Sequence, residues 1–251
     1  MDSEHIVKAY DEELQHLNNT IMEMGGIAEH QIAAAIQSVI KRDSELAAGV
    51  VEEDDRVDEL EHEVASFSVR LLALRQPMAS DLRNIVAALK VSSDIERIAD
   101  YAVNVAKRAI AINLTSTVAP VKRIPRMGHL VQTMVKDVLD AYVERDVQKA
   151  LKVWENDKDV DDMYDSLFRE LLTYMMEDPR SITSCAHLLF IAKNIERIGD
   201  HTTNIAEDIY YLVHGQPWYK ARPKGEEGIF IPSDLASPGG GPHHRGKKAA
   251  K

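Results

Sequence analysis

One pattern of twelve residues occurs twice in the chain: residues 95–106 read IERIADYAVNVA and residues 195–206 read IERIGDHTTNIA. Both copies contain the spacing Glu-x-x-x-Asp-x-x-x-Asn, formed by Glu96, Asp100 and Asn104 and then by Glu196, Asp200 and Asn204. Because four residues advance an α-helix by slightly more than one turn, each copy places two carboxylates and an amide on one helix face. The repeat predicts an oxygen-rich site that occurs twice.

The duplication extends upstream of this pattern. Asp54 and Asp58 form an Asp-x-x-x-Asp pair, and Asp157 and Asp161 form a second pair about a hundred residues later. A proline separates the two elements in each copy, at positions 77 and 179, where it can end one helix and allow the next to begin. This period is too long for a solenoid repeat and indicates a duplicated small domain.

The composition indicates an all-α fold. Seven of the twelve glycines and five of the nine prolines lie from Gly215 onward, so the preceding residues contain few helix breakers. No stretch alternates convincingly between apolar and polar residues, and we expect no sheet. The pattern predicts six long helices, three in each half, at residues 4–41, 44–75, 79–113, 122–145, 147–177 and 180–214.

Helices of this length are typical of antiparallel bundles. The second predicted helix has an apolar three-four spacing that should face the core, at Val57, Leu60, Val64, Phe67, Leu71 and Leu74. The sequence therefore predicts two tandem three-helix bundles, at residues 1–115 and 127–214, joined by a linker at 116–126. Residues 215–251 are rich in Gly, Pro and charge, which predicts a disordered tail.

The charge makes nucleic acid an unexpected partner. Of 30 basic and 41 acidic residues, seven basic and three acidic ones lie from Gly215 onward, which leaves 23 basic and 38 acidic, a net charge of −15, on residues 1–214. Such a surface repels a phosphate backbone. The N-terminal sequence does not resemble a signal peptide, and no apolar run is long enough to span a membrane. With Cys185 as its single cysteine, we expect a cytoplasmic protein.

Several motifs together resemble the PhoU family of bacterial regulators associated with phosphate transport. They are Arg75-Gln76-Pro77 followed by Asp81-Leu82-Arg83, the two Glu-Arg-Ile-x-Asp segments, the aspartate-rich stretches, and Met24-Gly25-Gly26. The resemblance covers residues 5–214. It implies a homodimer with multinuclear metal sites built from the paired acidic motifs. It also implies a negative regulator that links the ATPase subunit of the phosphate ABC transporter to a membrane sensor histidine kinase.

The residues themselves also favour metal binding. If Asp54 and Asp58 face Glu96 and Asp100, four mutually repelling carboxylates meet beside an apolar seam, and a cation would relieve that repulsion. The second site would comprise Asp157, Asp161, Glu196 and Asp200. Oxygen ligands favour iron, manganese or magnesium, with zinc also possible. Asn104 and Asn204 either ligate through their amide oxygens or hydrogen-bond a ligating carboxylate, and we favour the second role.

Other functions stay open on the sequence alone. Arg97 and Arg197 directly follow the two glutamates and could neutralise the carboxylates without any ion. His201 has Tyr101 as its counterpart, so we expect it to pack or to lie on the surface rather than to bind metal. A metal-dependent carboxylate-cluster enzyme and a metal-storage bundle are the alternatives to an adaptor. No P-loop and no Ser-His-Asp or Cys-His set is evident, so we expect no catalytic residues and no enzyme.

Overall fold

All regular elements of the computed structural model are helices; it describes residues 2–115 and 118–220, with side chains from Tyr10 onward except that of Pro120. The first half contains α1 (Asp2–Lys41), α2 (Ser44–Glu52), α3 (Asp55–Arg75) and α4 (Ser80–Asn113). The second contains α5 (Ile124–Glu144), α6 (Val147–Glu177) and α7 (Ile182–His214). Short 3-10 helices, Ala119–Arg123 and Pro179–Ser181, precede α5 and α7. Within the described ranges, no helix is both long and apolar enough to cross a membrane.

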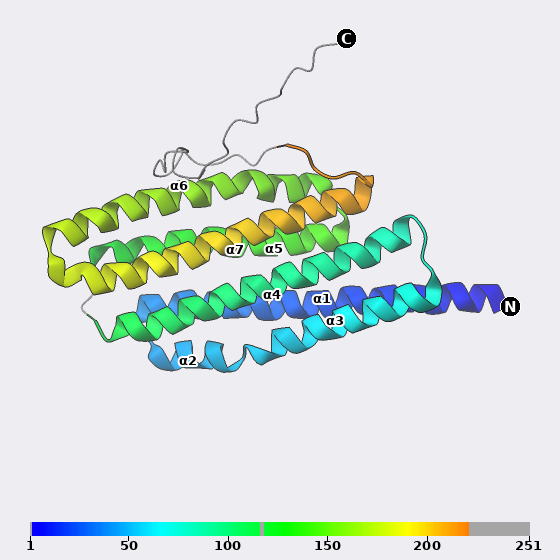
Figure 1. The fold of residues 1–251 in the computed structure, drawn as a ribbon, viewed down its shortest axis with the longest axis horizontal. Coiled ribbons are helices and arrows are strands. Elements are labelled where there is room, and N and C mark those ends of the chain that lie inside the picture. Colours follow the sequence, from blue (N-terminus) through cyan, green and yellow to red (C-terminus); the bar gives the residue numbers. More distant parts are fainter. Residues whose placement is uncertain (1, 116–117, 221–251) are drawn as a thin grey trace, which may run out of the picture.

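The two halves lie side by side, with α4 and α7 running antiparallel at the boundary between them (Figure 1). These two helices supply much of the core: fourteen residues of α4 and sixteen of α7 are buried. Most of them are Ile, Val, Leu or Ala spaced by three and four positions, which gives each helix one broad apolar face. The prediction of an all-α fold built from two tandem helical bundles is confirmed.

The second predicted helix, residues 44–75, is divided in the structure. α2 ends at Glu52 and α3 begins at Asp55, and all four residues 52–55 are acidic. Adjacent like charges repel one another and aspartate has a low helix propensity, so a continuous helix is disfavoured here. The buried side chain of Gln31 donates to the Glu53 carbonyl and so satisfies one backbone acceptor at the break. In the second half α6 continues unbroken through Asp157.

One predicted core residue of this helix, Leu74, is not buried in the structure. Val57, Leu60, Val64 and Leu71 are buried as expected, but Leu74 is 70% exposed. A helix has 3.6 residues per turn, so a repeated three-four spacing drifts around its axis. By the last turn of α3 this drift has carried Leu74 to the edge of the buried face.

The duplication is visible in the turns between helices. Asp43 caps α2 and Asp146 caps α6, and each carboxylate accepts two N–H groups from the helix that it begins. The residue before each cap, Arg42 or Arg145, has a φ of +56°. Residues that correspond across the halves therefore build the same left-handed turn, with a sequence offset of 103.

Glycine allows α1 and α5 to approach each other closely, again in a symmetric way. A Cβ atom on Gly25 of α1 would lie 2.6 Å from Leu139 of α5, and one on Gly128 of α5 would lie 2.4 Å from Ile36 of α1. The two contacts correspond to each other, because Gly128 follows Gly25 by 103 residues and Leu139 follows Ile36 by the same number. In the Met24-Gly25-Gly26 motif, Gly25 is therefore the glycine that allows the two halves to pack closely. A Cβ on Gly26 would meet nothing within 4 Å.

The segments that flank the second bundle differ from their predicted form. The predicted linker 116–126 contains a 3-10 helix and the start of α5 at Ile124. Residues 215–220 of the predicted tail have a described position: the Trp218 ring lies 5.6 Å from Trp154 and 4.8 Å from Tyr210. The rest of the predicted tail, residues 221–251, lies outside the described residues.

Candidate metal centres

The first predicted site lies between α3 and α4. Asp54 immediately precedes α3 and Asp58 lies in its first turn, whereas Glu96 and Asp100 lie on α4. Partial burial, and then the negative charges of Asp100 and Asp58, raise the pKa of Asp54. Burial and then the charge of Asp100 raise the pKa of Glu96, with a smaller contribution from Asp58. The structure therefore places all four carboxylates within electrostatic range of one another.

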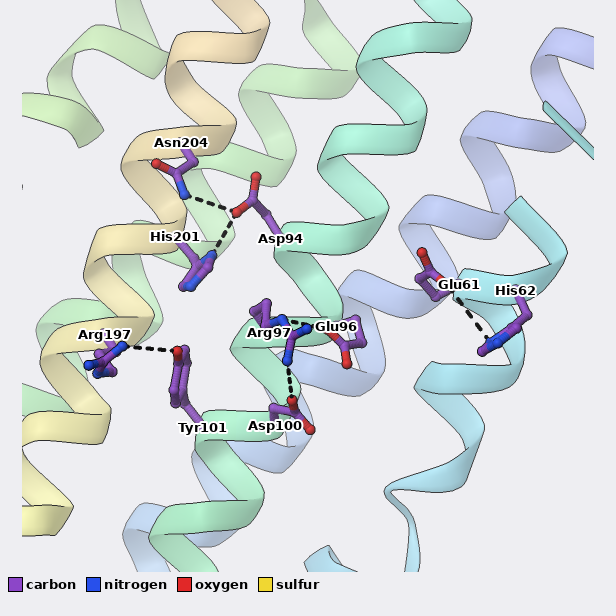
Figure 2. A network of polar contacts seen from close by, with 10 residues as sticks. All are labelled: Glu61, His62, Asp94, Glu96, Arg97, Asp100, Tyr101, Arg197, His201 and Asn204. Atoms are coloured by element: carbon purple, nitrogen blue, oxygen red, sulfur yellow. Dashed lines mark hydrogen bonds and ion pairs between the residues drawn. The ribbon is translucent and has the colours of Figure 1, made fainter. Parts of the chain in front are cut away.

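Arg97 holds two of these carboxylates. Its Nε atom lies 3.3 Å from Glu96 Oε2 and its Nη1 atom lies 3.1 Å from Asp100 Oδ2 (Figure 2). The Arg97 side chain is 55% exposed, so these ion pairs are screened by water and contribute at most about 1 kcal/mol. An arginine directly after the glutamate was expected to be able to neutralise the carboxylates, and in the first half Arg97 has that position.

One acidic residue near this site was missed. The negative charge of Glu61 of α3 also raises the pKa of Glu96, by less than the charges of Asp100 and Asp58 do. It follows Asp58 by three residues, which places both side chains on neighbouring positions of one helix face. Extending the Asp-x-x-x-Asp pattern by this helical spacing would have identified it.

The second predicted site is more deeply buried than the first. Asp157 of α6 is 4% exposed and Glu196 of α7 is 9% exposed, while Asp161 and Asp200 are partly buried. Burial raises the pKa of Glu196, and the Lys193 Nζ atom, which donates to Oε1 over 2.6 Å, opposes that shift. Glu196 Oε2 is buried and has no hydrogen-bond partner among the described residues. The most deeply buried carboxylates of the two predicted sites therefore belong to the second half.

A glycine brings Asp157 close to α7. A Cβ atom built on Gly199 would lie 2.8 Å from Asp157 Oδ1, which is closer than real Cβ atoms approach an oxygen. The corresponding residue of the first half is Ala99, which carries a Cβ atom. The two copies therefore differ in side-chain volume at this position although their acidic residues correspond.

The two clusters suit a hard cation in the chemistry of their donors, which are all carboxylate oxygens. Within residues 2–115 and 118–220, however, no group of three or more His, Cys, Asp or Glu side chains has positions that could hold a metal ion. Arg97 and Lys193 take up some of the oxygens. Their side chains are 55% and 39% exposed, so both can turn toward solvent without opening the core. The chemistry of the donors therefore fits a metal ion, whereas the described positions of the side chains do not form a metal site.

Residues between α4 and α7 form a polar network that the repeated motif does not predict. His201 Nδ1 lies 2.6 Å from Asp94 Oδ1, and Asn204 Nδ2 donates to the same oxygen over 3.0 Å. Figure 2 shows both α7 side chains directed at Asp94 of α4. His201 therefore has a polar partner in the other half, and Asn204 meets a carboxylate outside the predicted set. Asn104 is exposed.

Arg197 contacts the other half, whereas Arg97 forms ion pairs with residues of its own helix. Its Nη1 atom donates to the Tyr101 hydroxyl over 3.3 Å, and its guanidinium lies over the Tyr101 ring. Farther along the same boundary, Lys90 Nζ donates to the buried Asp208 over 2.6 Å. The corresponding positions of the other half hold Arg108 and Phe190, which form a cation–π contact at 4.6 Å. The boundary is thus symmetric in backbone and asymmetric in charge.

Known proteins share both the sequence and the fold. The PhoU domain matches twice, at residues 21–109 and 124–209. The "Phosphate-specific transport system accessory protein PhoU homolog" of Caulobacter vibrioides is 52% identical over 223 residues, which cover 88% of this chain and 97% of that protein. The protein with the same title from Zymomonas mobilis is 50% identical over 212 residues, covering 84% of this chain and 90% of that protein.

Solved structures agree with the sequence comparisons. The crystal structure of PhoU from Pseudomonas aeruginosa superposes with a TM-score of 0.81 at 41% identity, covering 82% of this chain and all of that one. The phosphate transport system regulatory protein PhoU from Streptococcus pneumoniae gives a TM-score of 0.78 at 27% identity, covering 83% of this chain and 99% of that one. Two domain matches, close relatives and the shared fold lead to one conclusion: the chain belongs to the PhoU family.

Proposed function

We propose that this protein regulates phosphate uptake and the phosphate-starvation response as a cytoplasmic adaptor without an enzymatic activity of its own. It would contact the ATPase subunit of the phosphate ABC transporter and a sensor histidine kinase, and restrain both when phosphate is abundant. The observation that carries this proposal is the 52% identity, over nearly the whole of both chains, to a relative named as an accessory protein of phosphate-specific transport.

The architecture suits an adaptor. The two bundles present separate outer surfaces on either side of the α4–α7 boundary, so two partners can bind without competing for one face (Figure 1). The described residues 2–214 form long helices with few irregular segments, and such helices keep their surfaces in a constant relative position.

Deletion of the protein from its host tests this function. Starvation genes should then stay active in high phosphate and phosphate uptake should rise, and both changes should reverse when the wild-type chain is restored. A reporter for one starvation gene, together with uptake of labelled phosphate, measures these effects. Unchanged repression in the deletion strain would show that the regulatory role is wrong.

We also propose that each half binds metal through the carboxylates of Asp54, Asp58, Glu96 and Asp100, and of Asp157, Asp161, Glu196 and Asp200. A bound cation would neutralise the repulsion within each cluster and connect α3 to α4 and α6 to α7. The buried Oε2 of Glu196, which has no hydrogen-bond partner among the described residues, supports this assignment in the second half. Iron, manganese, magnesium and zinc remain the candidates.

Metal content after purification tests the two sites separately. Asp100→Ala and Asp200→Ala should each remove roughly half of the bound metal, because each belongs to one of two corresponding sites. Asp55→Ala is the matched control, since Asp55 is an exposed neighbour of Asp54 outside both predicted sets. Metal content that neither site variant changes would remove the assignment. We also propose that the protein forms a homodimer, and light scattering on the same preparations tests this.

A further inference from the structure

The chain turns back toward its own last helix after α7. Gly215 ends α7 in the left-handed conformation, with a φ of +70°. Three residues later, the Trp218 ring lies 4.8 Å from the Tyr210 ring of α7 and 5.6 Å from the Trp154 ring of α6. A chain that continued along the axis of α7 would move away from both rings. The segment after α7 therefore lies over the seam between α6 and α7.

This seam is acidic beyond the aromatic contact. Trp154 Nε1 donates to Glu207 Oε1 over 3.0 Å, so Glu207 lies on α7 beside the Trp154 ring. α6 and α7 run antiparallel (Figure 1). Asp161 follows Trp154 by seven residues, and Asp200 precedes Glu207 by seven. Because a helix rises about 1.5 Å per residue, both aspartates lie about 10 Å farther along the seam, on the same side of the aromatic contact.

The carboxylates at that position favour an added positive charge. Glu196 is 9% exposed; its Oε1 accepts from Lys193, whereas its Oε2 is buried and has no hydrogen-bond partner among the described residues. Burial raises the pKa of Glu196, and the charges of Asp200 and Asp161 raise it further. A cation beside these three carboxylates would reduce their mutual repulsion.

The first half holds a cation where the second holds an acid. Lys107 directly follows the first copy of the twelve-residue pattern, and Glu207 directly follows the second. Burial and the neighbouring acids raise the pKa of Asp54, and the charge of Lys107 opposes this shift. The equivalent position of the second half adds a negative charge instead. A cation from elsewhere in the chain would therefore have a larger effect on the second cluster.

The sequence supplies such cations directly after Trp218. Lys220 Nζ lies 5.2 Å from the centre of the Trp218 ring. Arg222 and Lys224 follow, outside the described residues, and Pro223 between them disfavours a helical conformation at Arg222. In an extended chain alternate residues share one face, so Arg222 and Lys224 would reach about 7 and 13 Å beyond Lys220. These lengths bracket the distance of about 10 Å to the two aspartates.

We propose that residues 220–224 bind along this seam, with the side chains of Arg222 and Lys224 at the carboxylates of Asp161 and Asp200. The segment supplies positive charge to the second cluster, as a lysine of α4 does in the first. It also occupies two carboxylates of the proposed second metal site, so it competes with a cation in that half alone. The segment that follows α7 thus regulates one of two corresponding acidic clusters.

Carboxylate labelling of the metal-free, full-length chain tests this contact. Carbodiimide and glycine ethyl ester modify accessible carboxylates, and mass spectrometry gives the rate for each residue. In the double variant Arg222→Glu with Lys224→Glu, the rates at Asp161 and Asp200 should rise about threefold, because the ion pairs that cover them are lost. High salt should raise the same rates in the wild-type chain. Asp100 of the first cluster should label at an unchanged rate.

Arg245→Glu with Lys247→Glu is the matched control, because it makes the same charge change in the same tail, farther along the sequence. Its rates at Asp161 and Asp200 should equal those of the wild type. Trp218→Ala gives a second test: it removes the ring that holds the segment over the seam, so both rates should rise as in the charge variant. Circular dichroism verifies that each variant folds.

Three results would overturn the proposal. Equal rates in the wild type and in Arg222→Glu with Lys224→Glu would show that the segment does not cover the aspartates. An equal rise in the control variant would show an effect of net charge alone. The third result concerns cross-links, because carbodiimide without the amine joins Lys224 directly to a carboxylate in contact. A link to Asp161 or Asp200 within one chain supports the proposal, whereas a link between two chains assigns the seam to a second copy.

The same experiment separates this proposal from that of the metal sites. No metal ion is present during labelling, so a failure of the proposed metal sites would leave the labelling rates unaffected. Conversely, unchanged labelling would overturn the bound segment and leave the measurements of metal content as they stand.

Discussion

Gly199→Ala should reveal how tightly α6 and α7 pack at the second acidic cluster. Alanine is favoured over glycine within a helix by about 1 kcal/mol. At position 199, however, the new Cβ would lie 2.8 Å from Asp157 Oδ1, and Asp157 is only 4% exposed. Moving a side chain in a packed interior costs about 1–3 kcal/mol. The net change should lie between about zero and 2 kcal/mol of destabilisation.

Gly26→Ala is the matched control. Gly26 is also within a helix, and an added Cβ there meets nothing within 4 Å, so this variant should gain about 1 kcal/mol. Urea unfolding followed by circular dichroism measures both changes. The difference between the two variants, about 1–3 kcal/mol, isolates the contact with Asp157 from helix propensity.

Removing the opposing carboxylate completes the experiment. In an Asp157→Ala background the steric conflict is absent, so Gly199→Ala should recover the gain of about 1 kcal/mol. Equal stabilisation by Gly199→Ala and Gly26→Ala in the wild-type background would refute the close approach of Asp157 to α7. Gly199→Ala should also lower the metal content of the second site alone, because it displaces one of the proposed ligands.

Three further changes follow from the packing and the charges. Gly128→Ala should destabilise the protein by about 1–2 kcal/mol in urea unfolding, because three Ile36 atoms lie within 3.0 Å of the added Cβ; Ile36→Val should relieve part of this loss. Lys90→Ala should lower the stability by about 1–3 kcal/mol, because the 8%-exposed Asp208 loses its cation. The double variant Lys90→Ala with Asp208→Asn should recover part of this loss, and thermal unfolding measures both changes. Burial raises the pKa of Glu196 above 4.5, so the folded state binds its proton more tightly than the unfolded state does. Stability should therefore fall as pH rises above 4.5, and Glu196→Gln should flatten this dependence in unfolding measured from pH 4 to 8.

Much of the fold was predictable because helices depend on local spacing. The ends of α6 match the prediction at both boundaries, where Asp146 caps the start and proline follows the end. The break at residues 53–54 was harder to predict, since the four acidic residues 52–55 around it also fit a solvated helix face. Leu74 was misplaced because periodicity identifies a face but not the point at which neighbouring helices stop covering it.

The candidate site was predictable only in part. The i,i+4 spacing identified the acidic residues of each helix, and the duplication indicated which helices should face each other. It did not indicate that Arg97 would hold two carboxylates while Arg197 turned to Tyr101. Tyr101, the partner of Arg197, corresponds to His201 in the other copy, so the repeated motif does not specify this contact.

Apolar spacing and a repeated acidic motif are local properties, so the amino-acid sequence was enough to predict a duplicated all-α chain that resembles the PhoU family. Which charges meet could be seen only in the folded chain. Glu23, Arg56 and Glu59 form ion pairs at the seam of α1 and α3, whereas the corresponding residues of the second half, Arg126, Asp159 and Asp162, line a cleft between α5 and α6. The physical reason is that an ion pair depends on side-chain length and on the distance between helix axes, and both are set by packing among residues far apart in the chain.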